Sequence, residues 1–235
     1  MDSLSLMYGF DWTYLLVIAG ALLTMGVQAY MTSTFSRYQQ IESKSGLDAS
    51  RAAALILAGS GINNVKIGRV AGNLTDHYAP TKKELNLSDT TYSSRSIASI
   101  GVAAHECGHA IQDYKKDFLL NFQMTIIPVV NFAQTLAMPM LIIGLILGML
   151  GLAKIGIYLF CATLLYQLLT LPIEFGASNN AIQVLRAQGI MDESEIYGVK
   201  KVLTAAALTY VAAAASTFLQ LLRFILIVNN SRSRD

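Results

Sequence analysis

The chain alternates between long apolar stretches and polar segments, and this pattern predicts a membrane protein. A helix that crosses the hydrocarbon core of a bilayer needs about 20 mostly apolar residues. Four stretches approach or exceed this length and carry almost no charge, namely residues 12–30, 124–150, 155–171 and 202–228. We therefore expect four transmembrane helices.

Between the first two apolar stretches the pattern changes to the short elements of a polar segment. A helix is expected over residues 46–59, with Asp48 or Ser50 as its cap. Alternating polar and apolar residues predict three short strands, and the last two are expected to form a hairpin with a five-residue loop. These strands are residues 64–70, 74–78 and 84–88, and another helix is expected over 94–113.

Composition supports the membrane interpretation and argues against a nucleic-acid partner. Hydrophobic residues make up 54% of the chain and charged residues 14%, whereas a soluble domain has about 25% charged residues. The net charge of +2 does not indicate a basic surface that would bind nucleic acid. Cys107 and Cys161 lie in segments assigned to different environments, so we expect reduced thiols rather than a disulfide.

The distribution of basic residues predicts the orientation of the chain. Most of the 17 Lys and Arg residues lie in residues 32–123 and 172–201, and basic residues accumulate on the cytoplasmic side of membranes. Both segments are therefore expected in the cytoplasm, with both termini outside. No Lys or Arg precedes the first apolar stretch, which favours a retained helix over a cleaved signal peptide.

These observations together predict a mostly α membrane protein in which five segments follow one another. The four transmembrane helices accompany a cytoplasmic α+β segment that contains a small hairpin or sheet. The segments are an N-terminal transmembrane helix (1–31), a cytoplasmic catalytic segment (32–123), a transmembrane hairpin (124–171), a second cytoplasmic segment (172–201) and a C-terminal transmembrane helix with a short tail (202–235).

The candidate chemistry lies in the helix predicted over residues 94–113. His105, Glu106 and His109 form the pattern H-E-x-x-H. Residues four apart lie on one face of a helix, so both imidazoles can reach one metal ion. Glu106 is one step round the helix, where it can contact the attacking water as a general base without binding the metal. A small sheet with such a helix makes the cytoplasmic segment zincin-like.

A catalytic zinc site normally has three protein ligands, so the sequence must supply one more. Glu174 follows the third apolar stretch and is expected on the same side of the membrane as the motif helix. From topology alone it is equally well explained as an interfacial carboxylate at a helix end. The other candidates are His77, Asp113, Asp192, Glu193 and Glu195.

Beyond these residues, the sequence resembles the YugP-type membrane zinc metallopeptidases, which are similar in architecture to HtpX and the CAAX prenyl proteases. The resemblance covers most of the chain and rests on the order and spacing of several blocks. They are Ser45–Leu47, Gly61–Val65, Gly72–Tyr78, Leu87–Ser88, Val102–Gln112, Leu171–Phe175 and Ala177–Ser178. It implies a zinc peptidase of a bacterial cell membrane, with Glu174 as the third ligand.

The expected function is a membrane-embedded endopeptidase that binds one zinc ion per chain and acts on peptide or protein substrates. The family pattern has Asp where this chain has Ala79 and Gly176. These differences motivate an alternative, a zinc-binding membrane scaffold with weakened or no activity. The sequence does not single out substrate-binding residues, and the candidates for stabilising an oxyanion are His77, Arg186 and Tyr197.

Overall fold

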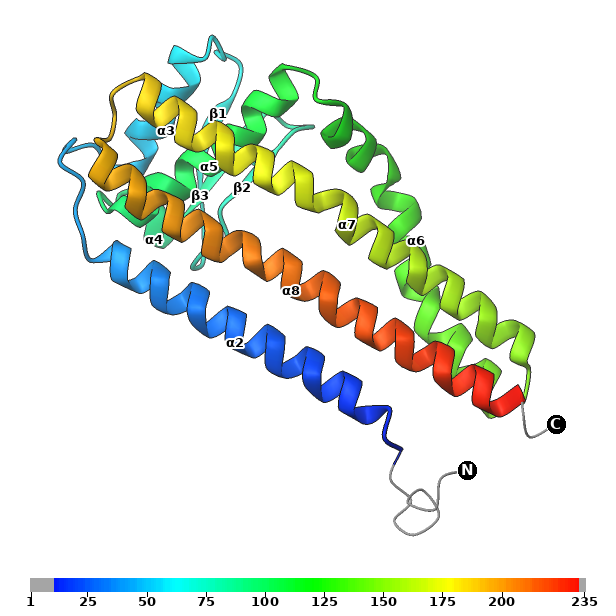
Figure 1. Cartoon of the computed structure of the whole chain (residues 1–235). Helices are drawn as coiled ribbons and strands as arrows, with labels where there is room; N and C mark the ends of the chain where they lie inside the picture. Colours follow the sequence, from blue (N-terminus) through cyan, green and yellow to red (C-terminus); the bar gives the residue numbers. More distant parts are fainter. Residues whose placement is uncertain (1–10, 233–235) are drawn as a thin grey trace. The chain divides into compact units, whose positions relative to one another are not determined.

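The structure is a computed structural model that describes residues 11–232. Residues 1–10 and 233–235, the outer ends of the first and last predicted segments, lie outside the described residues. The chain is mostly helical, as expected, and Figure 1 labels its elements. Within residues 11–232, four helices are long and apolar enough to cross a membrane, which agrees with the four predicted spans. They are α2 (Tyr14–Gln39), α6 (Phe118–Ile146), α7 (Leu150–Ala187) and α8 (Glu193–Arg232).

The chain forms two compact units. One contains the described parts of residues 1–27, 125–170 and 209–235, which hold most of the apolar helical sequence. The other contains residues 28–124 and 171–208, which include all the short elements. The H-E-x-x-H motif and Glu174 therefore belong to the same unit, and we call it the catalytic-motif unit.

Glycines allow close helix packing in the apolar unit. A Cβ atom at Gly144 of α6 would lie 2.4 Å from Ala153 N, and one at Gly156 of α7 would lie 2.6 Å from Leu141 N. Both distances are too short for a real contact, so only glycine allows the two backbones to approach this closely. Small residues commonly play this part between membrane helices, where association depends on packing.

The catalytic-motif unit contains a three-stranded sheet with the order β1-β3-β2. Its strands are β1 (Lys66–Val70), β2 (His77–Ala79) and β3 (Glu84–Ser88). Strands β2 and β3 pair antiparallel, so the predicted hairpin is present, although β2 begins later than expected. Strand β1 pairs parallel with β3. Because β3 is the central strand, only β1 and β2 have free edges.

Helices α3 (Ala49–Gly59) and α5 (Ile97–Tyr114) contribute most of the core of the catalytic-motif unit, to which β3, α7 and α8 also contribute. Helix α3 begins at Asp48, whose carboxylate accepts a hydrogen bond from Arg51 N, as the sequence predicts for a cap. The short helix α4 (Asp89–Tyr92) leads to α5, which carries the H-E-x-x-H motif. Helix α5 begins after Ser96, whose hydroxyl accepts from Ser99 N at 3.1 Å. Its buried residues, such as Ile100, Ala104 and Cys107, pack against those of α3.

Helices α7 and α8 continue well beyond the predicted spans into the catalytic-motif unit. Helix α7 ends at Ala187 and is followed by Gly189, which has a φ of +64°. Helix α8 then begins with reciprocal hydrogen bonds between Asp192 and Glu195, in which each backbone N–H donates to the other carboxylate. The predicted segment 172–201 is therefore a helical hairpin, and Glu174 lies within α7 rather than after its end.

Candidate metal centre

Helix α5 places the two motif histidines beside each other. His105 and His109 are four residues apart, and their ring centroids are separated by 4.8 Å in an edge-on arrangement. Their side chains are only 17% and 15% exposed. The helical spacing therefore brings both imidazoles to one partly buried position, as the sequence predicts.

Helix α7 brings Glu174 to the same position. Its Oε2 atom lies 3.3 Å from His105 Nε2 and 3.7 Å from His109 Nε2. Two ligand atoms held about 2.1 Å from a tetrahedral zinc ion are about 3.4 Å apart, which these distances approach. Among the described residues, Glu174 Oε2 is buried without a hydrogen-bond donor. A buried carboxylate oxygen in this state fits a position that a cation fills.

The three ligand atoms lie within 4.8 Å of one another. Two imidazole nitrogens and one carboxylate oxygen make the donor set of many catalytic zinc sites, which keep a fourth position open. The residues present therefore fit a zinc ion. Within the described residues, this His-His-Glu group is the one set of three or more such side chains placed to share a metal.

The outer nitrogens of both histidines have hydrogen-bond partners. His105 Nδ1 lies 3.1 Å from Ser178 Oγ, and His109 Nδ1 lies 3.0 Å from Gln112 Oε1. Such contacts fix the orientation of metal-binding imidazoles. The sequence analysis gave neither partner a role. Helical spacing could have suggested Gln112, which comes one turn after His109, and it places Ser178 one turn after Glu174, on the same face of α7.

Glu106 lies beside this cluster on α5 and is 8% exposed. No hydrogen bond or ion pair of the described residues engages its carboxylate. Burial lowers the pKa of His109, but interactions with Glu174 and Glu106 outweigh this effect and raise it above its ordinary value. A metal ion that binds His109 therefore competes with a proton.

Cys107 lies within the motif but points elsewhere. Its thiol contacts the carbonyl oxygen of Ala53 at 3.7 Å, inside the core between α3 and α5. Burial, reinforced by the charge of Glu106, raises the pKa of the thiol well above its usual range. Cys107 is therefore a neutral core residue.

Helices α5 and α7 come into close contact where Gly108 meets Ala177. A Cβ at Gly108 would lie 2.2 Å from the carbonyl oxygen of Ala177. Only glycine leaves room for that carbonyl, so Gly108 sets the distance between the helix that carries the histidines and the helix that carries Glu174. Asn180 adds a long contact from its Nδ2 to Gly108 O at 3.5 Å.

The other candidate ligands form contacts of their own. His77 is exposed, and its Nδ1 lies 2.9 Å from Thr75 O. Asp113 accepts hydrogen bonds of 2.5 Å from both Tyr78 and Lys83, which ties the β2–β3 hairpin to the end of α5. The three acidic residues at the start of α8 bind Lys44, Arg186 or the helix cap; they are Asp192, Glu193 and Glu195.

The candidates for stabilising an oxyanion also have other contacts. Arg186 forms an ion pair with Glu193, and Lys201 lies 5.3 Å from the ring centroid of Tyr197. His77 is not in the His-His-Glu group. The geometry therefore assigns none of the three to the cluster.

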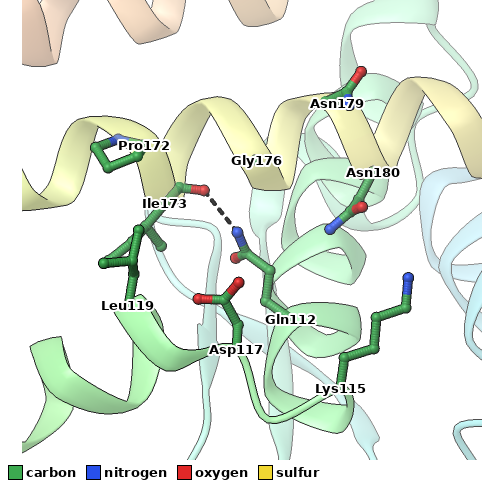
Figure 2. A pocket seen from close by; sticks show the side chains of 9 residues that line it. All are labelled: Gln112, Lys115, Asp117, Leu119, Pro172, Ile173, Gly176, Asn179 and Asn180. Carbon is green, nitrogen blue, oxygen red and sulfur yellow. Dashed lines mark hydrogen bonds between the residues drawn. The ribbon is translucent and has the colours of Figure 1, made fainter.

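A cavity of about 230 Å³ lies next to the cluster, between the end of α5 and α7. Figure 2 shows Gln112 in this cavity, with its amide nitrogen directed at the carbonyl oxygen of Ile173. Gly176, Asn180 and Lys115 line other parts of the wall. Gln112 thus contacts both His109 and the cavity.

Comparison with known proteins shows the family to which the chain belongs. Residues 13–229 match the family described as "Putative neutral zinc metallopeptidase", and the chain belongs to this family. It is also 43% identical over 220 residues to the "Putative membrane protease YugP" of Bacillus subtilis (strain 168), covering 94% of this chain and 98% of that protein. No solved structure matches the chain. The chain is thus a multi-pass membrane protein of a zinc metallopeptidase family, as the resemblance in its sequence implies.

Proposed function

We propose that this chain is a membrane-embedded endopeptidase that binds one zinc ion through His105, His109 and Glu174. The observation that carries the proposal is the convergence of these three side chains from α5 and α7, with the buried Glu106 carboxylate beside them. Membership of the zinc metallopeptidase family supports both the metal and the reaction.

In the proposed mechanism, Glu106 is the general base. When bound, zinc acts as a Lewis acid that polarises the scissile carbonyl and makes water acidic enough to react near neutral pH. Glu106 takes a proton from the attacking water as the new carbon–oxygen bond forms. It then gives this proton to the leaving nitrogen as the carbon–nitrogen bond breaks. His105, His109 and Glu174 hold the centre in place, and Gly108 keeps their two helices close.

The proposed substrates are peptides or proteins, and the proposed location is the plasma membrane of a bacterium. We propose that residues 32–123 and 172–201 form a zincin-like catalytic part on the cytoplasmic side. The segments 1–31, 124–171 and 202–235 anchor it in the bilayer. The excess of Lys and Arg in the two cytoplasmic segments supports this orientation.

Casein cleavage by the detergent-purified chain tests the proposal. We expect Glu106→Gln to lower the cleavage rate about 100-fold to 10,000-fold, because an amide cannot act as the base. The matched control is Glu42→Gln, which changes an exposed glutamate and should cleave at the parent rate.

A scaffold function is the rival outcome, motivated by Ala79 and Gly176 in place of the family's Asp. It would be supported if parent and Glu106→Gln chains both bind zinc and neither cleaves casein. Equal, measurable cleavage by the two chains would contradict the assigned role of Glu106.

A further inference from the structure

Gln112 makes two hydrogen bonds that join the two halves of the candidate metal centre. It lies on α5 one turn after His109 and is 5% exposed. Its Oε1 atom lies 3.0 Å from His109 Nδ1, and its Nε2 atom donates to the carbonyl oxygen of Ile173 at 2.9 Å (Figure 2). Ile173 directly precedes Glu174 on α7. The buried amide of Gln112 therefore connects the candidate ligand His109 to the backbone next to the candidate ligand Glu174.

These contacts determine which nitrogen of His109 carries hydrogen. The carbonyl oxygen of Ile173 can only accept, so the amide nitrogen of Gln112 must be the atom that faces it. The amide oxygen then faces His109 and can also only accept. His109 Nδ1 must therefore be the donor, and in the neutral ring this leaves the lone pair on Nε2. That atom is the one that faces Glu174.

We propose that Gln112 is the positioning residue that fixes the tautomer and orientation of His109, and that residue 176 is glycine because Gln112 occupies the space of its side chain. The inference rests on the proposed function only where it concerns zinc. The tautomer of His109 is a property of the metal-free chain as well.

Gly176 supplies a second, independent part of the argument. A Cβ at this position would lie 2.8 Å from Gln112 Nε2. Glycine is less favourable than alanine in a helix interior, and Gly176 lies well inside α7. Its backbone is not among the positive-φ glycines, so conformational freedom does not explain it. The contact with Gln112 does.

The most direct test measures the His109 tautomer in the full-length, metal-free chain in detergent. The chain has three histidines, so NMR of ¹⁵N-labelled imidazoles gives few signals, which single-histidine variants assign. We expect neutral His109 to carry hydrogen on Nδ1 in the parent. In Gln112→Met, which keeps the volume but loses both hydrogen bonds, we expect a shift towards the Nε2–H form.

The same variants are then titrated with zinc against a competing chelator. We expect Gln112→Met to weaken zinc binding about 10-fold to 100-fold, the usual loss when the partner of a metal-binding histidine is removed. The matched control is Asn179→Leu, which removes another amide that lines the same cavity, at an exposed position. It should keep both the tautomer and the affinity of the parent.

A double-mutant cycle tests the assignment of Gly176. Gly176→Ala should weaken zinc binding in the parent because the new methyl group displaces Gln112. In a Gln112→Ala background, where the methyl group has room, the same change should have no effect on affinity. An equal loss in both backgrounds would overturn the assignment of Gly176.

The positioning role of Gln112 is overturned if Gln112→Met keeps the parent's tautomer and zinc affinity. If Gln112→Met does not fold, Gln112→Glu replaces it, since its carboxylate still accepts from His109 Nδ1. The Nε2–H form as the main tautomer in Gln112→Glu would overturn the inference. A parent chain that binds no zinc contradicts the proposed function instead, and the tautomer still decides the role of Gln112.

Discussion

At the residue scale, the candidate centre depends on side chains that touch the ligands as well as on the ligands themselves. His105, His109 and Glu174 bring their ligand atoms within 4.8 Å of one another. The Nδ1 atom of each histidine has a hydrogen-bond partner, which is Ser178 of α7 for His105 and Gln112 of α5 for His109. The two helices therefore orient the ligands before any metal arrives.

Ser178 gives a prediction at this scale. Ser178→Ala removes the partner of His105 Nδ1, so the imidazole is held less firmly. We expect zinc affinity to fall about 10-fold to 100-fold, as measured by chelator competition. Asn179→Ala changes the exposed neighbour and should bind zinc like the parent. Unchanged affinity in Ser178→Ala would show that packing alone orients His105.

The sequence predicts the candidate metal ligands better than the residues that form hydrogen bonds with those ligands. The H-E-x-x-H spacing is local, so His105 and His109 could be paired from helical periodicity alone. Topology placed Glu174 on the same side as the motif helix, and both lie in one compact unit. Topology left its role open, and the family resemblance favoured it as a ligand. Gln112 lies one helical turn after His109, so spacing alone could have suggested their contact. The contact of Ser178 with His105 also depends on how α5 crosses α7, which no local pattern records.

At the element scale, the close approach of α5 and α7 controls the geometry of the site. The ligands come from both helices, and Gly108 is the residue at which their separation is set. The β2–β3 hairpin is attached to α5 through Asp113, which binds Tyr78 and Lys83. Helix α5 is therefore held on two sides, by α7 and by the hairpin.

Gly108→Ala tests the role of this contact. A methyl group 2.2 Å from Ala177 O must push the helices apart. Overpacking of this kind costs about 1–3 kcal/mol of stability, and we expect zinc affinity to fall as well, because Glu174 moves away from the histidines. Thermal unfolding in detergent and a zinc titration measure the two effects. Gly26→Ala, where a Cβ would meet nothing within 4 Å, is the control and should show neither loss.

Element boundaries and strand order were harder to predict than the elements themselves. Hydropathy ends the third span at residue 171 because the following residues become polar, but α7 continues as a helix to Ala187. Hydropathy shows which residues fit the hydrocarbon core of a bilayer, and it does not show where a helix ends. The parallel pairing of β1 with β3 joins strands that are not consecutive, and alternation within a strand does not specify its neighbour.

At the scale of the whole molecule, the two compact units differ in their sequence, because one is made of long apolar helical stretches and the other includes all the short elements. The apolar unit contains most of the sequence that fits a bilayer, and the catalytic-motif unit contains the sheet and the metal cluster. The chain passes between the units several times. The proposed orientation rests on the excess of Lys and Arg in residues 32–123 and 172–201.

Cysteine labelling tests this orientation. In a chain with Cys107→Ala and Cys161→Ala, a single cysteine is introduced at Lys82, Lys200 or Met149. We expect a membrane-impermeant maleimide to label Met149→Cys on intact cells, because this residue lies in the connection between α6 and α7, which the proposed orientation places outside. Lys82→Cys and Lys200→Cys should react only after permeabilisation. The reverse pattern would place the candidate centre outside the cytoplasm.

The most direct test of the central claim is the zinc content of the detergent-purified chain beside its Glu174→Ala variant, measured by elemental analysis. We expect near one zinc per chain in the parent and a clear loss in the variant, because removal of Glu174 leaves only the two histidines. Both chains should show the same helical content by circular dichroism. A parent without zinc, or a variant that keeps its zinc, would contradict the three-ligand centre.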